Sequence, residues 1–222
     1  EWLRYANTES LSYFMYQKPK TAKRMHFDVI PKAMDEYQQQ LRAYADQDSK
    51  AKLNNPVFHI HGHNVPGSDM VVSFTMLLNL AAVANASEKD QLWGFIQRYA
   101  PKASAETHPG LDEAAGFAVR YYNDFVKPAK VFRVATDLER EALVDLREQL
   151  TAYAGHLDAE ALQSIVFACG RERFDPLRNW FKAIYEVLLG ASQGPRFGGF
   201  IALYGINETI ALIDKALAEE LL

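Results

Sequence analysis

The sequence predicts an all-α protein of about eight helices joined by short connections. Apolar residues recur along most of its 222 residues at helical spacing, and capping residues precede several of these stretches. Alternating strand and helix patterns are absent, which argues against a parallel α/β fold. A chain of this length can bury about 70% of its unfolded surface, so a hydrophobic core can form without disulfides or metal.

The N-terminal part is predicted to contain two helices, a loop and an extended segment. Residues 8–16 begin with capping residues and continue with aromatics, which indicates a helix. Residues 20–45 follow as one helix, kinked or bounded at Pro31. Residues 46–56 are polar and predict a loop. Residues 57–64 alternate between apolar and polar side chains, which predicts a short extended segment.

The rest of the chain is predicted to be a succession of helices. Residues 70–86 are apolar on nearly all sides, which indicates a buried helix. Thr136 with Glu139 forms a capping box, and Asp158 is a second capping residue. The other expected helices cover residues 87–99, 110–126, 136–153, 158–170, 176–188 and 207–221. The glycine-rich stretch 190–199 is expected to connect the last two.

Charge and cysteine content limit the possible functions. The net charge is −4, which argues against a broadly basic nucleic-acid binder. The charge is uneven, however: residues 17–32 and 171–196 are basic, and residues 137–160 are acidic. Cys169 is the single cysteine, so no internal disulfide is possible, and we expect a small buried apolar side chain. No apolar run is long enough to span a membrane, and no signal peptide is visible.

Two motifs could suggest chemistry. His59, His61 and His63 would share one face of a strand and could bind a metal, but the remaining histidines lack ligand spacing. We therefore expect polar packing contacts from them and no metal site. Residues 194–199 are rich in glycine but lack the lysine and hydroxyl residue of a phosphate-binding loop. A tight turn between helices is the expected role of that stretch.

A cluster of arginines and aromatics near residue 175 points to RNA. Unpaired bases stack on aromatic rings and guanidinium planes, and phosphates favour arginine. The alternative is that the aromatics belong to the core while the arginines are solvated or paired with nearby carboxylates. The cluster consists of Arg171, Arg173, Phe174, Arg178 and Trp180.

Longer motifs run along the chain in a recognisable order. They include EWLRYA at residues 1–6, FMYQKPK at 14–20, FDVIP at 27–31, NPVFHIH at 55–61, GPRFG at 194–198 and FIALYG at 200–205. Together they resemble the class I lysyl-tRNA synthetases over essentially the whole chain. The resemblance implies the helical, cage-type anticodon-binding region that follows the catalytic domain in these enzymes.

The same resemblance implies that this chain is one part of a longer enzyme, the parent enzyme, whose catalytic residues lie elsewhere. The catalytic domain, with its two ATP-binding signatures, would precede this chain, and neither signature is present here; HIHG at residues 59–62 is not one of them. The parent would attach lysine to tRNA-Lys in the cytoplasm, using ATP with magnesium, while this segment would be inactive alone. We expect a basic helical connector at 1–70 and two helical anticodon-binding subdomains at 71–160 and 161–222. No DNA or membrane partner is expected.

Charge and position select the candidate tRNA contacts, because the resemblance assigns no role to single residues. Near the anticodon we expect Arg171, Arg173, Arg178, Trp180, Arg196 and Phe197. Contacts to the tRNA backbone are expected from Lys18, Lys20, Lys23 and Arg24. Two alternatives remain at this point. One is a helical protein-interaction scaffold without RNA contact, and the other is a metal-dependent enzyme that uses the three spaced histidines.

Overall fold

The computed structural model describes residues 1–62 and 64–222, and within them the regular structure is entirely helical. The prediction of an all-α fold is thus confirmed. The helices are α1 (Thr8–Tyr16), α2 (Ile30–Asp46), α3 (Ser49–Asn54), α4 (Pro56–His61), α5 (Phe74–Ala84), α6 (Asp90–Tyr99), α7 (Pro109–Tyr121), α8 (Asp137–Ala152), α9 (Ala159–Arg171), α10 (Arg178–Ile184), α11 (Phe197–Tyr204) and α12 (Ile206–Leu217). None of the described helices is both long enough and apolar enough to cross a bilayer.

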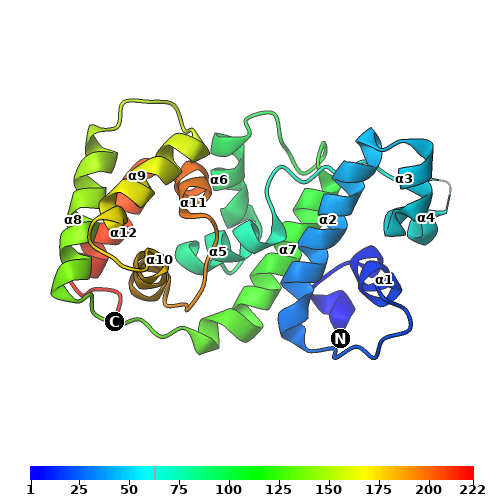
Figure 1. Cartoon of the computed structure of the whole chain (residues 1–222), viewed down its shortest axis with the longest axis horizontal. Helices are drawn as coiled ribbons and strands as arrows, with labels where there is room; N and C mark the ends of the chain where they lie inside the picture. The colour runs from blue at the N-terminus through cyan, green and yellow to red at the C-terminus, as the bar shows by residue number, and fades with distance from the viewer. Residues whose placement is uncertain (63) are drawn as a thin grey trace.

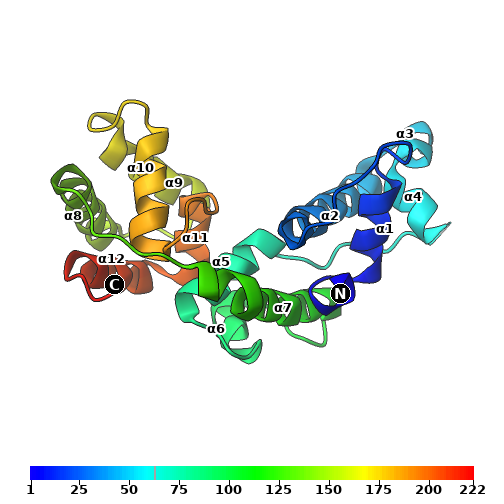
Figure 2. The same cartoon turned by 90° about the horizontal axis from the view of Figure 1, so that it is seen from below.

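The helices form an elongated, bent molecule. In Figure 1, α1–α4 lie at one end, α5–α7 in the middle and α8–α12 at the other end. Seen from below in Figure 2, both ends rise to the same side of the central helices, so the molecule resembles a wide V. The turn between α9 and α10 lies at the top of one arm, and the segment between α1 and α2 lies on the other arm.

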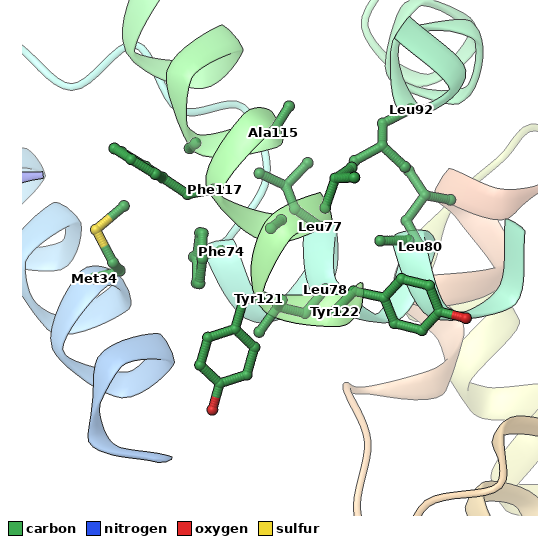
Figure 3. Packing of buried hydrophobic residues seen from close by; sticks show 14 of the residues in the cluster. Met34, Phe74, Leu77, Leu78, Leu80, Leu92, Ala115, Phe117, Tyr121 and Tyr122 are labelled. Carbon is green, nitrogen blue, oxygen red and sulfur yellow. The ribbon is translucent and has the colours of Figure 1, made fainter. Parts of the chain in front are cut away.

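The first hydrophobic core is built around α5. Its side chains Phe74, Leu77 and Leu80 are completely buried. Figure 3 shows them among side chains from the neighbouring helices, including Leu92 of α6 and Tyr121 of α7. Helices surround α5 on several sides and none of its residues is fully exposed, which explains why its sequence is apolar nearly all round.

The second core brings together α8 to α12. Helices α9 and α11 cross closely at Gly198, whose backbone N–H donates to the Gln163 side chain at 2.8 Å. The capping box predicted at Thr136 begins α8, and Asp158 caps α9 as predicted. The buried residues of this core come from both sides of residue 160, the predicted subdomain boundary, and include Leu150 of α8 and Leu162 of α9.

The segment between α7 and α8 connects the two cores through side-chain contacts. Lys130 donates to the Ala82 carbonyl near the end of α5 at 2.5 Å. Arg133 binds Glu139 and Glu186, both at 2.7 Å, in the second core. Burial lowers the pKa of Lys130 to about 8, with a contribution from repulsion by Lys127.

The N-terminal elements differ from the sequence predictions in two places. The helix expected at 20–45 begins only at Ile30, because Pro31 lies in its first turn, where its missing N–H is harmless. The basic residues before it are therefore outside any α-helix. The loop expected at 46–56 contains α3, which Asp48 caps by accepting from the Ala51 N–H at 2.8 Å.

The extended segment predicted at 57–64 is wrong, because residues Pro56–His61 form α4. Asn55 caps this helix by accepting from the Val57 N–H at 3.1 Å, and Pro56 occupies the first turn. Val57 is fully buried and Ile60 packs against the same small cluster. Their spacing of three residues fits one helical face, and this outweighs the apparent alternation of the sequence.

Candidate nucleic-acid interface

Two of the predicted arginines are exposed at the turn between α9 and α10. Arg171 is the last residue of α9, and Arg178 is the first residue of α10. Neither guanidinium has a hydrogen-bond or carboxylate partner in the described part of the chain. The turn also carries two exposed carboxylates, Glu172 and Asp175. Two cations are thus available for an anion at this end of the molecule.

The other two predicted arginines already have partners. Arg173 pairs with Asp145 of α8 at 2.8 Å and also donates to the Cys169 carbonyl at 2.7 Å. Arg196 forms a bidentate pair with Glu160 at 2.6 and 2.7 Å. Both side chains of the second pair are more than half exposed, so solvent weakens it, and a phosphate could replace the carboxylate.

The two predicted aromatics, Trp180 and Phe197, belong to the second core and are completely buried. The indole N–H of Trp180 donates to the Val166 carbonyl at 2.8 Å, and its ring lies so close to Gly170 that a Cβ there would meet it at 2.2 Å. Phe197 stacks on Phe200 with a centroid distance of 5.3 Å. The structure corrects the expectation that these rings meet tRNA bases, because neither ring has a face open to a ligand.

Close helix packing explains Gly198 in this glycine-rich stretch. A Cβ on Gly198 would lie 2.4 Å from the Ala159 carbonyl oxygen and from the Gln163 nitrogen. The Gly198 N–H is already occupied by the Gln163 side chain. An ATP phosphate does not fit here, because the backbone of α9 fills the space and the donor is used. The rejection of a phosphate-binding loop from the sequence agrees with this geometry.

The second predicted basic region follows α1. Lys18, Lys20 and Arg24 are exposed and have no partner in the described part of the chain. Lys23 is only half-exposed, because its ammonium group donates to the Phe14 carbonyl and lies 4.8 Å from the centre of the Phe14 ring. Three of the four cations are therefore free to meet a phosphate backbone, whereas Lys23 holds its own segment against α1.

The histidines make packing contacts. His59 stacks on Tyr16 at 5.3 Å and shares a hydrogen bond with the Leu53 carbonyl at 2.8 Å. His61 shares a hydrogen bond with the Tyr37 hydroxyl at 2.8 Å. His63 lies outside the described residues. No cluster of three candidate metal ligands occurs among the residues that the structure describes.

Comparisons with known proteins show which enzymes this chain is similar to. A family model described as class I (K) tRNA synthetases matches residues 1–64. The lysine–tRNA ligase of Roseobacter denitrificans is 75% identical over all 222 residues, and those of Rickettsia felis and Rickettsia conorii are 44% identical over 98% of the chain. The chain thus matches a segment of class I lysyl-tRNA synthetases along its whole length. It spans 42% of the length of each of these three relatives.

An acidic surface lies on one side of the α9–α10 arm of this synthetase segment. Asp137, Glu141 and Glu148 of α8 line an open groove beside Arg173. None of the three carboxylates has an ion-pair partner in the described residues, so this groove repels a polyanion. The free arginines at the α9–α10 turn are therefore the more favourable anion-binding region of the arm.

Sequence reasoning missed one aromatic residue of the synthetase segment. Phe167 of α9 is 42% exposed, and its ring meets that of Phe181 in α10 edge to face at 5.2 Å. It was missed because it fits the apolar pattern of an ordinary helix. Its position one turn before Arg171 is visible in the sequence, but its exposure follows only from the packing of α9.

Proposed function

We propose that this chain is the tRNA-binding region of a lysine–tRNA ligase and that it recognises the anticodon of tRNA-Lys. The observation that carries the proposal is the 75% identity to a relative named lysine–tRNA ligase along the entire chain. The parent protein would attach lysine to tRNA-Lys with ATP and magnesium, using residues outside this chain. A cytoplasmic location, expected from the sequence, remains part of this proposal.

The distribution of free cations supports the proposal. Arg171 and Arg178 lie at the end of one arm, and Lys18, Lys20 and Arg24 belong to the segment on the other. Both arms rise to the same side of the central helices (Figure 2). An elongated polyanion could therefore contact both basic regions from one side. We assign the α9–α10 region to the anticodon loop and the segment after α1 to the tRNA backbone.

The net charge of −4 is compatible with tRNA binding under this assignment. The free carboxylates of α8 line a groove beside Arg173, and they would exclude the RNA backbone from that side of the arm. Each phosphate contact adds a salt-dependent part of the total affinity. A few exposed arginines and lysines can thus orient a tRNA that the remainder of the ligase also holds.

Anticodon reading is tested by measuring the affinity of the chain for tRNA-Lys and for the same tRNA with a substituted anticodon. We expect tighter binding of tRNA-Lys by about tenfold or more, since each mismatched recognition contact costs about 1–3 kcal/mol. Equal affinities for the two RNAs would contradict anticodon recognition.

The contribution of the arginines is tested with the double variant Arg171→Gln/Arg178→Gln. Loss of two phosphate contacts should lower the slope of log affinity against log salt by about 1.4. Lys102→Gln is the matched control, because Lys102 is equally exposed but lies in the connection between α6 and α7. If both variants have the salt slope of the original chain, the assignment of the arginines is wrong.

A further inference from the structure

Phe167 presents a large part of its aromatic ring to water. It is 42% exposed, whereas Trp180 and Phe197 nearby are completely buried. Its edge-to-face contact with Phe181 holds the ring at an interplanar angle of 73°. Because the ring already packs against a neighbour, stacking a ligand on it requires little further loss of side-chain freedom.

Two cations flank this aromatic pair. Arg171 follows Phe167 by one helical turn in α9, and Arg178 precedes Phe181 by almost one turn in α10. The ring contact and the hydrogen bond from Trp180 to Val166 hold α9 and α10 side by side. Both arginines therefore lie on the turn side of the rings, with no partner among the described residues.

The local charge distinguishes between possible occupants. Residues 167–182 contain four basic and two acidic residues. Two of the basic residues are paired, Arg173 with Asp145 and Lys182 with Glu186, which leaves Arg171 and Arg178 unpaired among the described residues. A purely apolar docking surface for a protein has no need of two unpaired arginines beside its aromatic centre. An unpaired nucleotide uses both features, because its base has a flat π-face and its phosphates are anionic.

We propose that Phe167, supported by Phe181 and flanked by Arg171 and Arg178, is a stacking site for one unpaired base of an RNA loop. The inference rests on the proposed function, in which that loop is the anticodon loop of tRNA-Lys. Phenylalanine has no hydrogen-bonding group, so the ring itself supplies affinity without choosing the base. The arginines contact the phosphates on either side of the stacked nucleotide.

The experiment uses tRNA-Lys as the probe and three single variants of the chain. Phe167→Ala removes the ring, and Phe167→Leu retains apolar bulk but has no flat face. Tyr99→Ala is the matched control, because Tyr99 is 40% exposed but belongs to α6. Melting curves by circular dichroism establish that the variants remain folded, which the exposure of both side chains favours.

We expect Phe167→Ala to raise the Kd for tRNA-Lys by about 5- to 150-fold, the range for loss of one base–aromatic stack. The Phe167→Leu variant should bind almost as weakly, and Tyr99→Ala should bind like the original chain. The salt slope should be unchanged in all three variants, since no phosphate contact is removed. A fluorescent base analogue in the anticodon loop should be quenched on binding to the original chain and much less on binding to Phe167→Ala.

Wild-type affinity in Phe167→Ala, or in Phe167→Leu, would overturn the stacking site. A loss that is equally large in Tyr99→Ala would overturn it as well. Failure of the proposed function gives a different result, namely equal affinity of the original chain for tRNA-Lys and its anticodon-substituted form. If Phe167→Ala weakens binding of both RNAs in that case, the stacking site stands as a general RNA contact and only anticodon recognition fails.

Discussion

Substitution of Gly198 by alanine should destabilise the chain, although alanine is the better helix former. A Cβ at this position would lie 2.4 Å from the Ala159 oxygen and the Gln163 nitrogen, and 2.6 Å from the Gln163 Cα. Ordinary contacts of a Cβ lie at 3.4–4 Å, so α9 and α11 would have to separate by about 1 Å. The blocking atoms belong to the backbone and cannot turn aside as a side chain could.

The expected loss in the free energy of unfolding of Gly198→Ala follows from three contributions. Overpacking of a core costs about 1–3 kcal/mol. Separation of the helices also stretches the buried bond from the Gly198 N–H to the Gln163 side chain, which contributes about 1 kcal/mol. Alanine returns about 0.5–1 kcal/mol through its helix propensity. The net loss for Gly198→Ala should be about 1–3 kcal/mol.

Gly199→Ala is the matched control, one residue further along α11. The Cβ added there would meet only the flexible end of Met76 at 3.4 Å. This variant should therefore be as stable as the original chain or more stable by up to about 1 kcal/mol. Urea unfolding followed by circular dichroism should give a midpoint about 1 M lower for Gly198→Ala than for Gly199→Ala. Equal midpoints would refute the close contact between α9 and α11.

Three further predictions concern the segment before α8 and the exposed ion pair of α9. Burial lowers the pKa of Lys130 to about 8. Between about pH 8 and 10.5 the unfolded state therefore binds more protons than the folded state, so the free energy of unfolding rises with pH. The gain from about pH 7.5 to pH 9.5 should be at most about 2 kcal/mol. Urea unfolding at pH 7.5 and 9.5 should show this gain relative to Lys130→Met, and a constant difference between the two proteins would contradict it. Thr136→Ala removes half of the capping box of α8 and should lower the free energy of unfolding by about 1 kcal/mol; an unchanged urea midpoint would show that the Glu139 side chain suffices. Glu160→Gln releases Arg196 from an exposed ion pair, so the affinity for tRNA-Lys should increase. The free energy of unfolding should change by less than about 0.5 kcal/mol. A weaker affinity for tRNA-Lys would exclude Arg196 from the interface.

Local sequence signals predicted those elements in which neighbours along the chain supply the stabilising contacts. The capping box at Thr136 and the cap at Asp158 gave the starts of α8 and α9, because their hydrogen bonds span only two or three residues. The run at 70–86 predicted α5, since a fully apolar helix has to be buried. The extended segment at 57–64 failed because four to eight residues are too few to separate alternation from a short helical face.

The candidate interface was harder to predict, because exposure decides which side chain can bind a ligand. Arg171 and Arg173 are two residues apart and carry the same charge, yet the first is unpaired and the second is bound to Asp145. Trp180 and Phe167 are both aromatic, yet the fold buries the first and exposes the second. The distance between helices determines these outcomes, and the sequence pattern contains no direct record of it.

The sequence by itself determined the helical class, the positions of the main caps and the resemblance to class I lysyl-tRNA synthetases. These depend on periodicity, on short-range hydrogen bonds and on the order of motifs, all of which are properties of residues close together in the chain. Only the tertiary structure decided which arginines of the α9–α10 turn remain free, which aromatic side chain faces water and why position 198 needs glycine. Those features depend on contacts between α8, α9, α10 and α11, where a separation of about 1 Å distinguishes a packed backbone from an open site.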